Sequence, residues 1–266
     1  GNDGTDTLSD FETLRFADGN IDITPSGQSF DGTDIDDLFD GTIGADFIKG
    51  NKGNDTLKGL EGDDYIEGGD GDDTIEGGDD NDIIKGDGGD DTLYGGDGVD
   101  TIYGGEGDDT IYPGLGSGNQ SDLQVIDAGA GDDYISGRID SGYEQVTYPT
   151  LKVIGGTGND TVVGAAAYFD GGEGDDSITL EDLDYKVDFL DGGEGTDSLT
   201  IRRDYYSTIY EDYGSQSIED AITNFEIINF EGTTDSFTLG SQIGSAGENI
   251  TINHNAQTGD FNSLSE

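Results

Sequence analysis

The sequence predicts an all-β solenoid, in which short strands and tight turns alternate along a coiled chain. The main observation is a stretch of 81 residues, 32–112, that divides without remainder into nine units of nine residues. In every unit the first position is glycine, the sixth is aspartate and the eighth is apolar. A fixed period of this kind is typical of proteins whose repeats stack on one another. We expect two units to form one turn of the solenoid, so that residues 18 positions apart stack.

Each unit combines turn residues with one core residue. Residues 68–76, GGDGDDTIE, have glycine at positions 1, 2 and 4, where positive φ angles would permit a tight turn. Positions 7–9 are expected to form a very short strand, with the eighth side chain facing inward. Ile35 and Asp80 replace the fourth glycine. We expect distorted turns at both positions, or, at Asp80, an additional carboxylate that reaches a bound cation. The expected core residues are Phe39, Ile48, Leu57, Ile66, Ile75, Ile84, Leu93, Ile102 and Ile111.

The composition is strongly acidic. The 266 residues include 61 acidic and 10 basic ones, for a net charge of −51, and 30% are hydrophobic. Such a composition alone predicts disorder, unless cations neutralise the charge at fixed places. The sign of the charge excludes nucleic acid and anionic membrane surfaces as partners, and no apolar run predicts membrane insertion. The chain has no cysteine and no methionine, and no signal peptide is visible, so we expect a piece of a longer chain or a processed product.

The sixth-position aspartates are the candidate metal ligands. A tight turn points backbone carbonyl oxygens inward, and the aspartate adds a carboxylate. Oxygen ligands without nitrogen or sulfur suit calcium, and the array offers sites for multiple ions. Four further aspartates occupy the same position in looser units after residue 112. The full set of candidates is Asp37, Asp46, Asp55, Asp64, Asp73, Asp82, Asp91, Asp100, Asp109, Asp133, Asp160, Asp176 and Asp197.

Four segments are expected along the chain. Residues 1–31 end a preceding array and add a cap-like segment, and residues 32–112 form the regular roll. Residues 113–200 continue it irregularly, with strands such as 187–191, and Asp160 is expected to stand in an isolated unit. Residues 201–266 form a β cap and a flanking segment. The cap prediction depends on Phe-Glu followed by apolar residues, which occurs in both 9–16 and 223–230.

The unit Gly-Gly-x-Gly-x-Asp-x-apolar-x resembles the hemolysin-type calcium-binding repeat of the RTX (repeats-in-toxin) family. The resemblance implies a right-handed parallel β-roll with calcium between successive turns, export by type I secretion and folding outside the cell. It also implies that Asp37, Asp55, Asp73, Asp91 and Asp109 line one edge, and that the other four aspartates of the array line the opposite edge. With one ion between stacked neighbours, about seven ions are expected.

The favoured function is non-enzymatic: a calcium-binding structural or adhesive region of a secreted or cell-surface protein. His254 is the only histidine, so no nucleophile–base pair is apparent. Two alternatives remain. One is a polysaccharide-binding module of a secreted enzyme, which would use the aromatic and basic residues of 113–230, including the tyrosines of 205–213. The other is a subunit that associates with itself into an extracellular fibre or surface layer.

Overall fold

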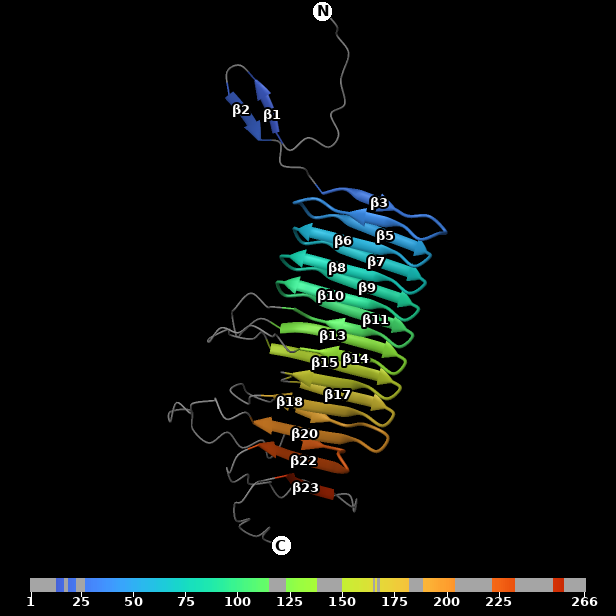
Figure 1. Cartoon of the computed structure of the whole chain (residues 1–266), viewed down its shortest axis with the longest axis vertical. Coiled ribbons are helices and arrows are strands. Elements are labelled where there is room, and N and C mark those ends of the chain that lie inside the picture. Colours follow the sequence, from blue (N-terminus) through green and yellow to red (C-terminus); the bar gives the residue numbers. More distant parts are fainter. Residues whose placement is uncertain are drawn as a thin grey trace, which may run out of the picture.

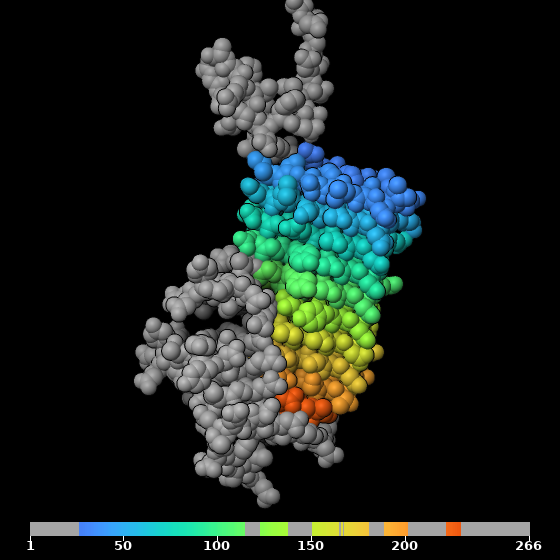
Figure 2. All heavy atoms as spheres, viewed as in Figure 1, coloured from blue at the N-terminus to red at the C-terminus, as the bar shows by residue number. Residues whose placement is uncertain are grey.

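The computed structural model describes residues 13–16, 19–22, 27–114, 123–137, 150–164, 166, 168–181, 189–203, 222–232 and 251–255. All regular secondary structure in these residues is β-strand, and no helix among them is long and apolar enough to span a membrane. The strands stack into an elongated roll (Figure 1). In the space-filling view, the residues follow one another along this column in the order of the sequence (Figure 2). The predicted all-β solenoid is confirmed.

Two parallel sheets face each other, and the chain alternates between them. The ten-stranded sheet contains, in spatial order, β3 (Ser29–Asp31), β5 (Phe47–Lys52), β7 (Tyr65–Asp70), β9 (Ile83–Gly88), β11 (Thr101–Glu106), β13 (Leu123–Ala130), β15 (Thr150–Thr157), β17 (Tyr168–Glu173), β19 (Phe189–Asp191) and β21 (Ile222–Thr223). The eleven-stranded sheet contains β4 (Leu38–Asp40), β6 (Thr56–Glu61), β8 (Thr74–Asp79), β10 (Thr92–Asp97), β12 (Thr110–Tyr112), β14 (Tyr134–Ser136), β16 (Thr161–Gly164), β18 (Ser177–Glu181), β20 (Ser198–Arg203), β22 (Ile227–Gly232) and β23 (Thr251–Asn255).

The register of the sheets confirms the predicted stacking. Within the regular array, each residue pairs with the residue 18 positions away, as Thr92 does with Thr74 and Thr110. Two nine-residue units therefore form one turn, and equivalent positions lie above one another along the roll.

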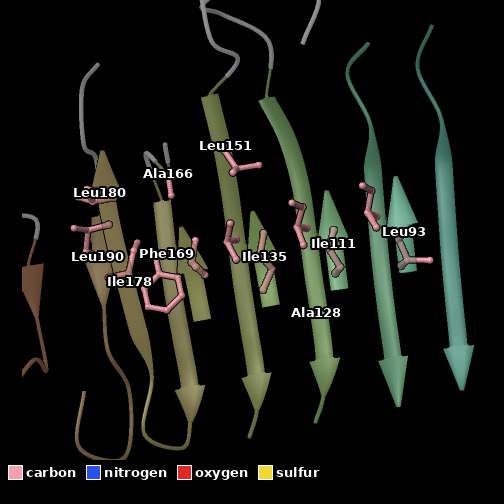
Figure 3. Packing of buried hydrophobic residues seen from close by; sticks show 14 of the residues in the cluster. Leu93, Ile111, Ala128, Ile135, Leu151, Ala166, Phe169, Ile178, Leu180 and Leu190 are labelled. Carbon is pink, nitrogen blue, oxygen red and sulfur yellow. The ribbon is translucent and has the colours of Figure 1, made fainter. Parts of the chain in front are cut away.

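The core is a narrow stack of aliphatic side chains between the two sheets. The eighth-position residues from Ile48 to Ile111 are at most 1% exposed, and Phe39 at the end of the roll is partly buried. Beyond the array, residues such as Ile135, Phe169 and Leu190 extend the same stack. Figure 3 shows these side chains on successive strands along the interior. So thin a core buries little apolar area per residue, which limits the stability that burial alone provides.

The strands are longer than predicted, because pairing continues into the next unit. β7 runs for six residues, covering positions 7–9 of one unit and positions 1–3 of the next. Positive φ is found at the second and fourth positions, as at Gly69 (119°) and Gly71 (132°), but not at the first. The expectation that the first glycine adopts positive φ is therefore wrong. Asp80 has a φ of 81°, so this substitution keeps the backbone of the fourth-position glycine rather than distorting the turn.

The two Phe-Glu segments differ in structure. Near the N-terminus, β1 (Thr13–Phe16) and β2 (Gly19–Asp22) form an antiparallel pair. In segment 223–230, by contrast, β22 pairs in parallel with β20 and with β23, so this expected cap is itself a turn of the roll. The predicted strand at 187–191 is present as β19.

The two edges of the roll differ in regularity. At what we call the first edge, the chain passes from the ten-stranded to the eleven-stranded sheet; at the second edge it returns. After residue 112 the second-edge connections become unequal: 165–167 is short, whereas 113–122, 137–149, 182–188 and 204–221 are longer. The first-edge connections stay short, as at 131–133, 158–160 and 174–176. Insertions between units are therefore absorbed at the second edge.

Candidate metal centre

The structure arranges the thirteen predicted aspartates in two ladders. At the first edge, the backbone N–H of each aspartate donates a hydrogen bond to Oδ1 of the aspartate in the next turn, as from Asp73 to Asp91 at 2.7 Å. This ladder contains Asp37, Asp55, Asp73, Asp91, Asp109, Asp133, Asp160, Asp176 and Asp197. The ladder at the second edge contains Asp46, Asp64, Asp82 and Asp100.

The first ladder continues well past the regular array. Asp160 lies between Asp133 and Asp176, with N–H to Oδ1 distances of 3.0 Å and 2.8 Å along the ladder. The expectation that Asp160 stands alone is therefore wrong. The stacking is not apparent in the sequence, because successive aspartates from Asp109 to Asp197 are separated by 24, 27, 16 and 21 residues instead of 18. The variation is absorbed at the second edge, while the first-edge connections 131–133, 158–160 and 174–176 keep one length.

The second carboxylate oxygen of most ladder aspartates is buried without a partner. Each of eleven Oδ2 atoms has less than 1 Å² of exposed surface and accepts no hydrogen bond. Leaving a buried charged oxygen unpaired is among the most costly arrangements in a protein interior. These atoms belong to Asp55, Asp64, Asp73, Asp82, Asp91, Asp100, Asp109, Asp133, Asp160, Asp176 and Asp197.

The first-position glycines leave room for these oxygens. A Cβ atom on Gly50 would lie in the space taken by Oδ2 of Asp55 and by the carbonyl oxygen of Gly68 in the next turn. A Cβ on Gly86 would meet Asp91 and the carbonyl of Gly104 in the same way. Where the first position is glycine, each level of the ladder therefore brings a carboxylate oxygen and a backbone carbonyl oxygen to one place that has no side chain of its own; at the level of Asp133 the first position is Ala128.

Burial raises the pKa values of the ladder carboxyl groups. It raises the pKa of Asp73 to about 6 and those of Asp82 and Asp91 to about 8. The hydrogen bond from the stacked backbone N–H lowers each pKa, and the stacked aspartate charges raise it again. In the absence of cations, the ladder thus places like charges close together in a buried environment.

The donor set fits calcium. Among the described residues, no group of three or more Asp, Glu, His or Cys side chains could hold a metal ion. A cation at the ladder must therefore take most of its ligands from carbonyl oxygens, with one or two carboxylates at each level. Oxygen ligands in a flexible arrangement are those of calcium, whereas magnesium requires strict octahedral geometry. A bound divalent cation would provide the missing partner for each Oδ2.

The first aspartate of each ladder differs from the rest. Oδ2 of Asp37 accepts hydrogen bonds from the backbone N–H of Thr33 at 2.6 Å and from its hydroxyl at 3.0 Å. Thr42 donates the same two bonds to Oδ2 of Asp46, at 2.6 Å and 3.2 Å. Neither threonine has positive φ, unlike the residues at this second position in later units. Sequence reasoning missed this closure, although threonine in place of the second glycine was the available signal.

An exposed row of hydrogen bonds, made by the fifth-position residues, runs beside the aspartate ladders. Most fifth-position N–H groups of the array donate to the side chain one turn earlier, as from Asp90 to Asp72 at 3.1 Å and from Asp108 to Asp90 at 2.9 Å. Asn159 takes the same place further along, bonded to Asp132 at 2.7 Å. The paired aspartates at positions 5 and 6 thus satisfy backbone N–H groups in both directions along the roll, a role that sequence reasoning also missed.

Comparison with known proteins supports the assignment of the repeats. A family model described as the RTX calcium-binding nonapeptide repeat (4 copies) matches residues 31–66, 50–84, 58–93, 85–119, 125–142 and 152–167. No curated protein and no solved structure matches the chain.

Proposed function

Since the chain carries RTX calcium-binding nonapeptide repeats, we propose that it is a structural region of a secreted or cell-surface protein that folds on binding calcium outside the cell. The observation that carries this proposal is the set of eleven buried carboxylate oxygens without a hydrogen-bond partner. A roll with a thin core and so many unpaired buried charges requires counter-ions in order to be stable.

The unpaired oxygens also support a proposal for how many ions the roll holds. At the first-position glycines, Oδ2 of the aspartate in the same unit lies near a carbonyl oxygen of the next turn, and we take each unpaired Oδ2 as one level. We propose eleven calcium levels, eight at the first edge and three at the second, where sequence reasoning gives about seven. The increase comes from the continuation of the first ladder past residue 112. Eleven divalent ions would neutralise about 22 of the 51 negative charges.

Calcium availability supports a location outside the cell. Extracellular calcium modules bind with Kd values of roughly 10⁻⁴–10⁻³ M, and an unfolded acidic chain has no preformed site for the ion. The chain would therefore remain unfolded where calcium is scarce and fold where it is abundant. Export through a type I system and a spacing or adhesive role after folding are part of this proposal.

A non-enzymatic role is the preferred proposal. The RTX solenoid is a structural calcium-binding fold. The polysaccharide-binding alternative depends largely on the tyrosines of 205–213, which lie outside the described residues. No observation on the described part of the roll favours that alternative or self-association into a fibre or surface layer.

Circular dichroism of the metal-free chain tests the proposal. We expect a coil spectrum in chelator and a β spectrum when millimolar calcium is added, with isothermal titration calorimetry reporting about eleven ions. Magnesium at the same concentration should not substitute, and sodium chloride at matched ionic strength controls for charge screening. A β spectrum that persists in chelator, or that sodium chloride alone restores, would refute calcium-dependent folding.

A further inference from the structure

We propose that Glu226 is a calcium ligand that closes the last level of the first ladder, in the place of a sixth-position aspartate. This inference rests on the proposed calcium-dependent function. No sixth-position aspartate follows Asp197 in the sequence, so the nine-residue motif does not identify this site.

Glu226 makes the hydrogen bond that defines the ladder. The backbone N–H of Asp197 donates to Oε2 of Glu226 at 2.7 Å. One turn earlier, the N–H of Asp176 donates to Oδ1 of Asp197 at 2.8 Å. Glu226 therefore takes the same position relative to Asp197 as Asp197 takes relative to Asp176.

The level between Asp197 and Glu226 offers the same oxygens as the levels above it. Asp197 is 0% exposed, and its Oδ2 is one of the eleven unpaired atoms. A Cβ on Gly192 would meet this Oδ2 and the carbonyl oxygen of Asn224. At Gly50, the equivalent atoms are Oδ2 of Asp55 and the carbonyl oxygen of Gly68. The last level thus repeats the oxygen arrangement of the regular array.

A shortened turn explains why the residue is glutamate. Asp191 pairs with Thr223, and from these residues the chain takes six positions to reach Asp197 but only three to reach Glu226. Asn224 has a φ of 54° and so provides the left-handed residue that glycine provides elsewhere. Phe225 is 3% exposed and fixes the turn to the core. We infer that the additional methylene of glutamate supplies the reach that the shorter turn lacks.

The charges at this level require a cation. The buried carboxylate of Asp197 lies in the ladder between Asp176 and Glu226, so that acidic side chains follow one another in successive turns. Within the described residues, the ion pairs involve Lys49, Lys52 and Lys58, which lie near the opposite end of the roll. A divalent cation between Asp197 and Glu226 would pair the unpaired oxygen and offset both charges.

Two substitutions in the full chain separate a ligand from a simple hydrogen-bond acceptor. Glu226→Gln keeps an amide oxygen that can accept the N–H of Asp197, but it removes the charge. We expect it to bind one calcium ion fewer than wild type by calorimetry and to fold at a higher calcium concentration. Glu173→Gln is the matched control, because Glu173 is exposed in a neighbouring turn of the same edge, and its stoichiometry should equal that of wild type.

Asp197→Asn provides an independent test of the same level. This variant should also lose the ion between Asp197 and Glu226. The double variant with Glu226→Gln should then bind as many ions as Asp197→Asn alone. If Glu226→Gln binds the full number of ions with an unchanged folding midpoint, Glu226 only caps a backbone N–H and the inference is wrong. If wild type itself binds no calcium, the proposed function fails and this site fails with it.

Discussion

The glycine at the first position of each unit is explained by two oxygen atoms rather than by backbone conformation. Gly86 does not adopt positive φ, so a larger residue would not be excluded on conformational grounds. Its missing Cβ leaves the space in which Oδ2 of Asp91 and the carbonyl oxygen of Gly104 lie. The invariance of this position along the array therefore reflects the space that these two oxygens occupy, whereas glycine at positions 2 and 4 reflects left-handed backbone.

Substituting two glycines of the same strand tests this distinction. Gly86→Ala should displace the two oxygens and raise the calcium concentration required for folding. Gly88→Ala in β9 is the matched control, because the nearest atom to its Cβ would be 3.9 Å away and its φ is not positive. It should be neutral or stabilising by roughly 0.4–1 kcal/mol, through lower entropy of the unfolded chain. Calcium titrations followed by circular dichroism would measure both, and equal effects would contradict the explanation.

The aspartates of the ladder should not contribute equally. Asp73→Asn removes charge from an unpaired buried oxygen, and Asp160→Asn does the same further along the ladder. Both should raise the calcium concentration at the midpoint of folding. Each tenfold loss of affinity corresponds to about 1.4 kcal/mol of folding free energy when the ion is in excess. Asp37→Asn should have a smaller effect, because Thr33 already provides partners for Oδ2 of Asp37. A shift for Asp37→Asn as large as that for Asp73→Asn would mean that the threonine-closed turn also binds a cation.

A strand and its turn together form the element that the roll repeats, and a few turns carry strain. Leu60 occupies the second position with a φ of 87°, which is costly for a side chain branched at Cγ, and it is 43% exposed. Gly78 takes the equivalent place in the next turn of that edge, with a φ of 124°. The sequence thus places leucine where the backbone favours glycine.

Leu60→Gly should therefore stabilise the roll. Removing the left-handed strain is expected to raise the free energy of unfolding by about 1 kcal/mol in saturating calcium. Asn51→Gly is the comparison, since asparagine tolerates this conformation and its Nδ2 donates to Asp31 and Gly32, each at 3.0 Å. That change should bring no gain. Urea unfolding of the two variants would measure the difference, and a destabilised Leu60→Gly would show that packing of the leucine outweighs the strain.

The period of the sequence was sufficient to predict the stacking and the core, and the resemblance to the RTX repeat added the two aspartate edges. The period was not sufficient for Asp160, whose neighbours in the ladder are 27 and 16 residues away. It also missed Thr33 and Glu226, which act through turns of altered shape. Their roles depend on where a side chain points after the turn has changed, and a repeat pattern does not contain that information.

In the molecule as a whole, regular and variable features are separated between two edges. The first edge carries nine stacked aspartates and then Glu226. The second edge carries four aspartates and then the long connections. Because a solenoid is held together mainly by contacts between neighbouring turns, one continuous ladder can maintain the stacking while the other edge varies. The aspartate ladder of the first edge therefore links the regular and irregular halves of the roll.

This buried line of carboxylates should make folding depend on pH in opposite ways with and without calcium. The folded pKa values of Asp64, Asp73, Asp82 and Asp91 are raised from 3.8 to between about 6 and about 8, chiefly by burial. A raised folded pKa means that the folded state binds protons more tightly than the unfolded state. Its stabilising contribution is complete below the unfolded value and is lost as pH rises through the folded values. The calcium-free chain should therefore contain less β structure at pH 8.5 than at pH 5.5.

Calcium should reverse this dependence, because the ion binds the deprotonated carboxylates and competes with protons for them. The calcium midpoint for folding is therefore expected to rise as pH falls from 8.5 to 5.5. Circular dichroism at a series of pH values, in chelator and in calcium titrations, would measure both trends. A calcium midpoint that is constant across this range would mean that the ions do not bind at the buried carboxylates of the ladder.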